Sequence, residues 1–350
     1  MPTSFQTVDF PLAENGFDEI IDVRAPVEFA EDHMTGAINL PVLRDEEREL
    51  VGTQFKQDSA FAAQKSGAAM VSTNIGRHMQ EHFAAKPESY RPLIYCFRGG
   101  QRSRSLATVL SEIGWEVSVI EGGYKSYRRH VLRTLEELSR SLSFRVIDGL
   151  TGSGKTLLLH ALETHGAQVL DLEGFANHKG SVFGANLADS EQPAQKRFES
   201  LIYDRLSLLS DSAPIFVEAE SARIGRLFVP LPLLEKIRKS PVAKIEAPLD
   251  ARVNYLHRDY MDWLASPETV IESIDRLRSY HSKETIARWK QWCGEGNWKS
   301  LISELLSKHY DQYYGSDGQG NYRDPDTLIE LDDLSEEAIQ HSAVGLLRGH

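Results

Sequence analysis

The feature that most constrains the fold is the stretch FRVIDGLTGSGKT at residues 144–156. Its last eight residues satisfy the G-x-x-x-x-G-K-[ST] pattern of a phosphate-binding loop, and the helical sequence LLLHALETHG follows them. The glycines let the backbone curl so that N–H groups point at an anion, while Lys155 and the positive end of the helix add charge. Thr156 offers a hydroxyl that could hold a divalent cation on a phosphate oxygen. The predicted phosphate-binding residues are Gly149, Thr151, Gly152, Ser153, Gly154, Lys155 and Thr156.

Length and composition restrict the class of protein. The chain has 350 residues, for which two domains are the default, and its 41% apolar and 26% charged residues are typical of globular proteins. The net charge of −12 means that a nucleic-acid partner would have to use a local basic patch. We find no apolar run of membrane-spanning length and no signal-peptide pattern, and two cysteines cannot form a disulfide framework. We therefore expect no membrane association and a reducing, cytoplasmic location.

Short strands alternate with helices along the chain. EIIDVR (residues 19–24) and RPLIYC (residues 91–96) are predicted strands with helical segments between them. This alternation predicts an α/β fold with parallel sheets, whose functional groups collect at the carboxyl ends of the strands. We expect a first domain at residues 1–130, a basic helical linker at 131–143, and a phosphate-loop α/β domain with a helical C-terminal region at 144–350.

Cys96 lies at the end of a predicted strand and is followed by FRGGQR and a helix. Backbone N–H groups and the helix N-terminus should stabilise its thiolate, and nearby arginines should favour that form and attract anions. We therefore predict a reactive thiol at Cys96, with Arg98 and Arg102 as its catalytic partners. Cys293 lies in the segment QWCGEGN, which holds no basic residue, and it is predicted to be structural. The remaining residues of the predicted anion loop are Gly99, Gly100, Gln101 and Arg104.

Three segments of the N-terminal half, DVRAPVEFAEDHMTGAINLPV, YCFRGGQRS and EGGYKSYR, resemble the rhodanese domain of sulfurtransferases. The resemblance implies that Cys96 carries a persulfide or its selenium equivalent. It also implies that Asp22 and Arg24 form a structural ion pair and that His33 caps or packs. Five residues separate Cys96 from Arg102, one more than in the common C-x-x-G-x-R form. Because this longer spacing also occurs in cysteine phosphatases and arsenate reductases, a phosphatase remains an alternative, although no acidic residue stands out as its general acid.

Residues 122–145 form the clearest basic run, with six Lys or Arg against two Glu and with Tyr124 and Tyr127 interleaved. One interpretation is a solvated linker helix. The other is a phosphate-backbone contact for a nucleic acid, because clustered positive charge supplies most of the affinity in such contacts. In that case the contacting residues would be Lys125, Arg128, Arg129 and Arg133.

Two predicted strands of the second half end in acidic residues. AQVLDLEG ends at Asp171 and Glu173, and APIFVEAES carries Glu218 and Glu220. In phosphate-loop proteins an acidic residue at such a strand end helps to hold the metal ion. Here Glu218 or Glu220 replaces the usual aspartate, or the role falls to Asp171. This departure weakens the case for ordinary ATP or GTP hydrolysis and leaves Mg²⁺ dependence open.

Three further segments have predicted roles. Residues 176–193, ANHKGSVFGANLADSEQP, form a polar loop that could close over a ligand. Residues 250–310 are predicted to be a helical bundle whose aromatic side chains lie mainly in its core. The final thirty residues are acidic and polar, and we expect a peripheral tail or edge.

CFRGGQRSRS, GLTGSGKT, DLEGFANHKGSVFG and IFVEAES, in this order, closely resemble the tRNA 2-selenouridine synthase family from about Glu19 to about Pro230. The resemblance implies a tRNA partner whose wobble 2-thiouridine becomes 2-selenouridine, with selenophosphate as selenium donor. It also implies geranyl transfer from geranyl diphosphate to that sulfur, giving an S-geranylated intermediate. The phosphate loop would hold the diphosphate or selenophosphate, while Cys96 handles selenium. An enzyme that supplies selenophosphate is a candidate partner.

Two other functions stay open. One is a sulfurtransferase coupled to a phosphate-loop NTPase that passes persulfide sulfur to a protein. The other is a non-catalytic protein that binds tRNA or a nucleotide and whose cysteine loop is inert. The oligomeric state, the prenyl pocket and the tRNA contacts are left open by the sequence.

Overall fold

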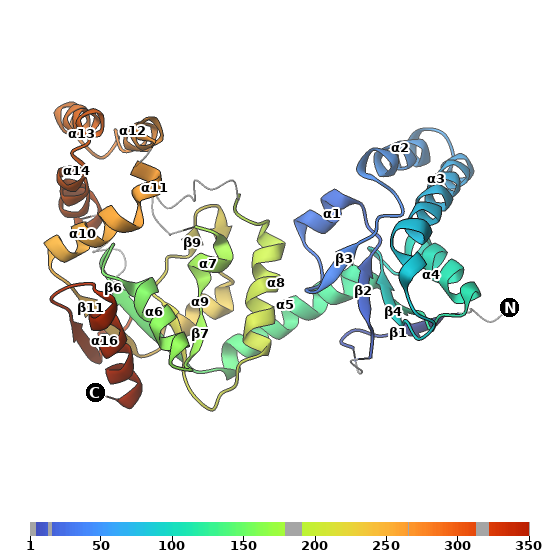
Figure 1. The fold of residues 1–350 in the computed structure, drawn as a ribbon, viewed down its shortest axis with the longest axis horizontal. Coiled ribbons are helices and arrows are strands. Elements are labelled where there is room, and N and C mark those ends of the chain that lie inside the picture. The colour runs from blue at the N-terminus through green and yellow to red at the C-terminus, as the bar shows by residue number, and fades with distance from the viewer. Residues whose placement is uncertain (1–4, 13–15, 179–190, 265, 313–321, 350) are drawn as a thin grey trace. The chain divides into compact units, whose positions relative to one another are not determined.

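The computed structural model describes residues 5–12, 16–178, 191–264, 266–312 and 322–349 (Figure 1). The chain divides into two compact units, Met1–Thr134 and Leu135–His350. The division falls inside α5 (Gly123–Ser141), which is one continuous helix. Each unit holds a five-stranded sheet and its own apolar core. The predicted α/β class is therefore confirmed.

The sheet of the first unit is parallel throughout, with the strand order β1-β5-β4-β2-β3. All four residues of β4 are buried, as expected of a central parallel strand. Ile94 of β4 lies opposite Ile21 and Val119 on the neighbouring strands, and all three side chains join one apolar core. The strands are β1 (Gln6–Val8), β2 (Glu19–Asp22), β3 (Ala37–Asn39), β4 (Pro92–Tyr95) and β5 (Ser118–Ile120).

Helix α4 (Gln101–Ile113) positions the cysteine loop that precedes it. Its apolar face buries Leu106 and Leu110 in the core, and it ends at Gly114, whose φ of 114° is accessible to glycine. The other helices of this unit, apart from the start of α5, are α1 (Pro26–Glu31), α2 (Asp45–Gln57), α3 (Ala60–Glu81) and the short 3₁₀ helix η1 (Phe83–Ala85).

The main sheet of the second unit is also parallel, with the order β12-β11-β6-β8-β7. β6 lies at its centre and runs directly into the phosphate loop, so the loop emerges at the carboxyl edge of the sheet. The strands are β6 (Phe144–Gly149), β7 (Gln168–Leu170), β8 (Ile215–Glu218), β11 (Val242–Glu246) and β12 (Thr327–Glu330), with β9 (Arg223–Ile224) and β10 (Leu227–Phe228) forming a separate antiparallel pair.

The C-terminal residues are part of this second core. β12 lies at one edge of the sheet, in keeping with the expected peripheral tail or edge, but α16 (Glu336–Arg348) packs against α6 (Lys155–Thr164). Ile339, Ala343 and Leu346 of α16 are buried in the apolar cluster. The prediction of a peripheral tail is therefore wrong for this helix, because its apolar residues recur at helical spacing.

A helical bundle follows β11, as predicted. Trp289 is fully buried at its centre and lies in one cluster with Ile274 and Leu301, so this aromatic residue belongs to a core. The helices of this bundle are α10 (Leu249–Asp259), α11 (Met261–Leu264), α12 (Pro267–Asp275), α13 (Lys283–Glu295), α14 (Trp298–Leu305) and the π-helix η2 (Leu306–Tyr310). The remaining described helices of the second unit are α7 (Leu172–Ala176), α8 (Gln195–Ser207) and α9 (Leu231–Arg238).

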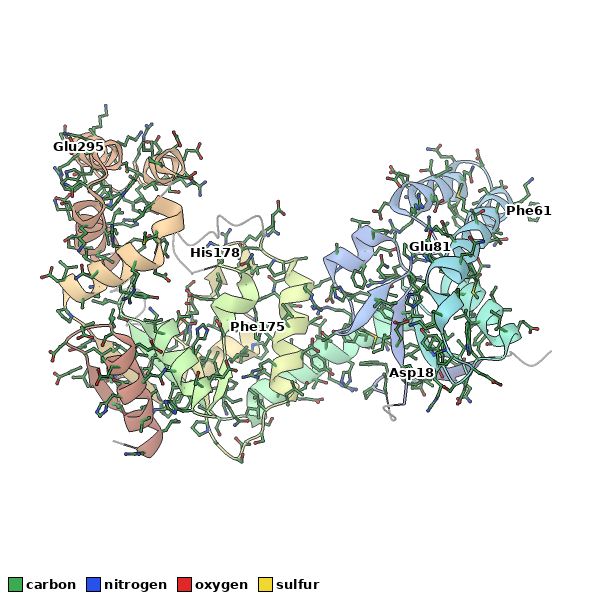
Figure 2. All side chains as sticks on the ribbon, viewed as in Figure 1. Asp18, Phe61, Glu81, Phe175, His178 and Glu295 are labelled. Atoms are coloured by element: carbon green, nitrogen blue, oxygen red, sulfur yellow. The ribbon has the colours of Figure 1, made fainter. Side chains whose placement is uncertain are left out.

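Most of the loop predicted at residues 176–193 lies outside the described residues, which stop at His178 (labelled in Figure 2) and resume at Glu191. Among the helices that the structure describes, none is long and apolar enough to cross a membrane.

Candidate active site

The phosphate loop connects the end of β6 to the start of α6. Gly152 and Gly154 have φ angles of 78° and 85°, in the left-handed region that favours glycine. A Cβ atom on Gly152 would lie 2.7 Å from Leu256 Cδ1, so a larger residue would also collide with α10. Ser153 is 1% exposed, and its Oγ has no hydrogen-bond partner among the described residues. The loop thus has the curled backbone that an anion cradle requires.

Lys155 and Thr156 start α6 and point to different partners. The Lys155 ammonium donates to the Gly149 carbonyl oxygen at 2.9 Å, which folds it back over the loop. The Thr156 hydroxyl donates to Glu218 Oε2 at 3.0 Å. Of the four predicted acidic partners, Glu218 is therefore the one that the structure brings to the loop hydroxyl.

Glu218 belongs to a cluster with Glu173 and Glu220, in which one carboxylate oxygen from each residue lies within 4.8 Å of the others. Glu218 is fully buried, and its Oε1 has no hydrogen-bond partner among the described residues. Burial and mutual repulsion, partly offset by Lys155, raise the pKa of Glu173 and Glu218 to about 8 and that of Glu220 to about 7. The cluster therefore retains protons near neutral pH unless a cation replaces them.

Asp171 has a structural role instead. Its carboxylate accepts a hydrogen bond from the Gly174 N–H at 2.7 Å and so caps α7. The other carboxylate oxygen lies 3.1 Å from the His160 ring nitrogen. Asp171 is outside the cluster of three glutamates.

In the first unit, Cys96 follows β4 directly and is 3% exposed. Its sulfur accepts hydrogen bonds from the Gly100 N–H and from the Ser103 hydroxyl, both at 3.2 Å. The loop sits tightly on the start of α5, because a Cβ atom on Gly123 would lie 2.1 Å from the Cys96 carbonyl oxygen. Two hydrogen-bond donors thus reach the Cys96 sulfur, one from the backbone and one from a side chain.

The three arginines of the cysteine loop have separate surroundings. Arg102 pairs with Glu28 at 2.7 Å, and Arg104 donates to the Gly99 carbonyl oxygen at 3.1 Å. Arg98 is exposed and lies over the Phe97 ring, with its guanidinium carbon 5.7 Å from the ring centroid. The Gln101 side chain is exposed at the start of α4.

Burial alone would raise the pKa of the Glu28 carboxyl, but the hydrogen bond and the positive charge of Arg102 lower it by more, so this pKa lies below its ordinary value. The Arg102 charge is therefore held by a carboxylate, and Arg98 is the more accessible cation of the two predicted catalytic arginines.

Both structural predictions from the rhodanese resemblance are confirmed. Asp22 and Arg24 form a buried ion pair with a nitrogen–oxygen distance of 2.6 Å. The His33 ring stacks on Phe29, with 3.8 Å between ring centroids.

Comparison with known proteins decides the family. The family model of the tRNA 2-selenouridine synthase AAA domain matches residues 142–285, and that of the rhodanese-like domain matches residues 7–130. A tRNA 2-selenouridine synthase of a Sulfurovum species is 32% identical over 340 residues, covering 88% of this chain and 91% of that protein. The chain belongs to the tRNA 2-selenouridine synthase family. Two other members, from Nitrosomonas europaea and Psychromonas ingrahamii, are 39% and 37% identical over 69% of this chain, matching 63% and 64% of their own lengths.

In this family member the basic run lies on α5. Lys125, Arg129 and Arg133 are exposed and follow one another at intervals of four residues, so they share one face of the helix, while Arg128 is half-buried. The interleaved Tyr124 and Tyr127 are 4% and 2% exposed, so they are core residues and offer no stacking surface for a base.

Sequence reasoning missed Arg252, which is 3% exposed on α10. Its guanidinium donates to the Thr151 carbonyl oxygen at 2.8 and 2.9 Å and pairs with Asp311 at 2.7 Å. Arg252 therefore fixes the phosphate loop to the helical bundle. No local pattern marks it, because it lies 101 positions beyond Thr151 in the sequence.

Replacing Arg252 with alanine should destabilise the protein by about 3 kcal/mol, because Asp311 and the Thr151 carbonyl would lose a buried charged donor. Chemical denaturation followed by circular dichroism measures this. Arg288→Ala is the control, since the Arg288–Glu304 pair in the same helical bundle is partly exposed and should contribute less than about 1 kcal/mol. Equal losses of stability in the two variants would contradict the assigned role of Arg252.

Proposed function

We propose that this chain is a tRNA-modifying transferase that converts wobble 2-thiouridine to 2-selenouridine through an S-geranylated intermediate. Its small substrates would be geranyl diphosphate and selenophosphate. One observation carries the proposal: a member of this family combines a hydrogen-bonded cysteine loop with a phosphate loop whose acidic partner is a buried glutamate. The first suits chalcogen chemistry, and the second suits a phosphate-bearing reactant.

In the first step we place the diphosphate in the loop of residues 149–156. The thiocarbonyl sulfur of the base attacks C1 of the geranyl group, the C1–O bond breaks, the diphosphate leaves with the electron pair, and the base releases its N3 proton to solvent. Backbone N–H groups and the Lys155 ammonium would stabilise the negative charge that builds up on the leaving group.

In the second step selenium replaces the alkylated sulfur. Alkylation matters because it turns a poor leaving group into a thiol, so that a selenium nucleophile can form the C2–Se bond while the C2–S bond breaks. Cys96 would help to expel the thiol: its thiolate attacks C2 and the geranyl thiol leaves, and selenium released by hydrolysis of the P–Se bond of selenophosphate then displaces the cysteine sulfur from C2. Carrying the selenium as a selenopersulfide would require a two-electron oxidant in addition. The Cys96 sulfur has two hydrogen-bond donors, and the exposed Arg98 could attract selenophosphate.

A divalent cation such as Mg²⁺ fits the glutamate cluster beside the phosphate loop. Glu218 Oε1, which has no hydrogen-bond partner among the described residues, and the Thr156 hydroxyl are the hard oxygen ligands that Mg²⁺ prefers, and Glu173 and Glu220 could add to them. When bound, the ion would neutralise diphosphate charge.

Mg²⁺ binding should tighten as the pH rises from about 6 to about 9, because the cation must displace protons from the glutamate cluster. The raised pKa values also imply that the cation-free protein loses stability as the pH rises from about 4.5 to about 8, since over this range the folded state keeps protons that exposed glutamates with a pKa of 4.5 have released. Calorimetric titration with MgCl₂ at the two ends of this range measures the first effect. Glu218→Gln should weaken binding, whereas Glu246→Gln, at the end of β11 and about half exposed, should not. An affinity that is independent of pH would contradict the site.

We assign the tRNA contact to the exposed basic face of α5, through Lys125, Arg129 and Arg133 with Arg128 beside them. A cytoplasmic location and a supply of selenophosphate from a partner enzyme belong to the same proposal.

A transfer assay tests the proposed function directly. Thiolated tRNA should accept label from geranyl diphosphate, and the same tRNA without the 2-thio group should not. The coupled sulfurtransferase–NTPase alternative predicts instead that ATP or GTP is hydrolysed without tRNA. Nucleotide hydrolysis combined with no geranyl transfer would overturn the proposal.

A further inference from the structure

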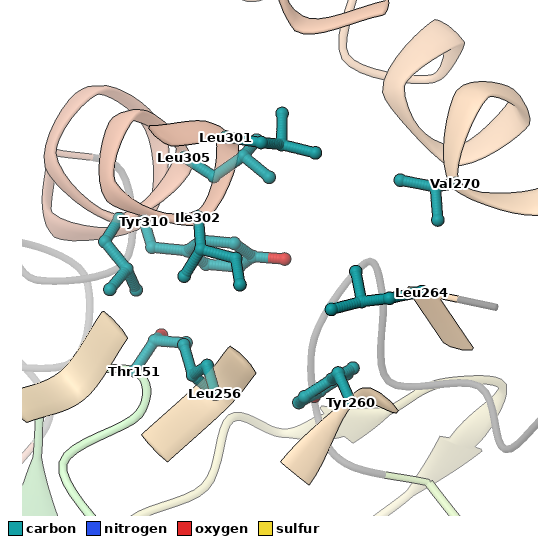
Figure 3. A pocket seen from close by; sticks show the side chains of 10 residues that line it. Thr151, Leu256, Tyr260, Leu264, Val270, Leu301, Ile302, Leu305 and Tyr310 are labelled. Atoms are coloured by element: carbon teal, nitrogen blue, oxygen red, sulfur yellow. The ribbon is translucent and has the colours of Figure 1, made fainter. Parts of the chain in front are cut away.

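An apolar pocket adjoins the phosphate loop within the second unit (Figure 3). Ten residues line it, from the loop, from α10 to α12, and from α14 and η2. Its empty space is about 500 Å³, the open mouth included. Of the ten lining residues, only Thr151 belongs to a predicted site, the phosphate loop.

The pocket and the phosphate loop are contiguous. Thr151 belongs to both, and Leu256 of the pocket wall lies so close to Gly152 that a Cβ atom there would be 2.7 Å from it. The buried Arg252 holds the Thr151 carbonyl and so fixes the loop at the pocket edge. A ligand whose phosphates occupy the loop would therefore have its next atoms at the Thr151 side of the pocket.

The chemistry of the wall selects an apolar group. Seven of the ten lining residues are aliphatic, two are tyrosines and one is a threonine. A nucleobase needs several hydrogen-bond partners on its edges, and a wall with this composition would leave most of them unpaired. A hydrocarbon chain needs none and gains free energy from each methylene that leaves water.

We infer that this pocket binds the hydrocarbon chain of an isoprenoid diphosphate whose phosphate groups lie in the loop. The inference rests on the proposed function and adds a specific chain-binding site to it. Val270 and Leu301 lie across the pocket from Thr151 (Figure 3), so they would contact the part of the chain farthest from the phosphates.

Binding without turnover tests the pocket independently of catalysis. Geranyl thiolodiphosphate, which resists transfer, and inorganic diphosphate are titrated into the full-length protein in the absence of tRNA. We expect the geranyl compound to bind about 100-fold more tightly, because only it buries a chain. Equal affinities would overturn the inference.

A bulky substitution then locates the chain. Leu264 is half-buried at the pocket, so Leu264→Trp should fill the space with little effect on folding. We expect the substitution to lower the affinity for geranyl thiolodiphosphate at least about tenfold and to leave the affinity for inorganic diphosphate unchanged. Leu208→Trp, at a residue that is 80% exposed beyond α8, is the matched control and should change neither affinity. An equal loss of affinity for both ligands in Leu264→Trp would contradict a chain-binding pocket.

A cavity-forming variant gives a second readout. Leu301→Ala should shift the preference from geranyl towards farnesyl thiolodiphosphate, whereas an unchanged preference would contradict contact with the far end of the chain. The outcomes separate the two proposals. Geranyl transfer that is unaffected by all pocket variants would overturn the assignment of the pocket to the chain but leave the proposed function intact. Binding that depends on the hydrocarbon chain, without any transfer to tRNA, would support the chain-binding role of the pocket and overturn the proposed function.

Discussion

Replacing Cys96 with serine is expected to abolish selenium incorporation into thiolated tRNA while geranylation continues at the wild-type rate. A hydroxyl is a far weaker nucleophile than a thiolate, so serine could not displace the geranyl thiol from C2. Serine is close in size and can keep the hydrogen bonds from Gly100 and Ser103, so the loop should stay folded. Nucleoside mass spectrometry of the two modified uridines, measured on the same tRNA sample, gives both rates.

Cys293 provides the control for this substitution. It is 2% exposed in the helical core, and burial raises the pKa of its thiol to about 11, so it is uncharged at neutral pH. Cys293→Ala should therefore leave both reactions intact in protein that remains folded. Normal production of selenouridine by the Cys96→Ser variant would show that the thiol is not part of the selenium step.

Replacing Lys155 with alanine is expected to lower kcat/KM for geranyl diphosphate by about 100-fold or more, since the loop loses its only side-chain cation. The ammonium now rests on the Gly149 carbonyl oxygen, 2.9 Å away, from which it can turn to a bound phosphate. Steady-state transfer of labelled geranyl groups to thiolated tRNA measures the loss.

Lys239→Ala removes an exposed lysine beyond α9 in the same unit and is the matched control, for which we expect no change. If Lys155→Ala geranylates tRNA at the normal rate, the diphosphate does not bind in this loop.

The sequence predicts most of what lies within one stretch of chain. The phosphate loop combines spacing, glycine and a flanking strand and helix, and its conformation agrees with that pattern at Gly152 and Gly154. The position of Cys96 at the end of a buried strand follows from the apolar run before it. Both are local properties, because they depend on backbone geometry over a few residues.

Contacts between distant segments could not be predicted from the sequence. Glu218 could be told from Glu220 and Asp171 only by its hydrogen bond to Thr156, which is 62 residues away. The pairing of Arg102 with Glu28 spans 74 residues, and it leaves Arg98 as the more accessible cation. Such pairs depend on which strand ends the sheet order brings together, and a single sequence has no signal for that.

Composition was misleading in the C-terminal region. Acidic and polar residues suggested a peripheral segment, yet Ile339, Ala343 and Leu346 of α16 complete the core against α6. Helical periodicity was the better guide there, because a helix needs only one apolar face to be buried.

We expect the cysteine and phosphate loops to serve two successive reactions on one tRNA base. Mass spectrometry of wobble nucleosides, after thiolated tRNA is incubated first with geranyl diphosphate and then with selenophosphate, tests it most directly. We expect S-geranyl-2-thiouridine after the first addition and its conversion to 2-selenouridine after the second. Formation of 2-selenouridine at the same rate when geranyl diphosphate is omitted, or a geranylated base that selenophosphate leaves unchanged, would contradict the account.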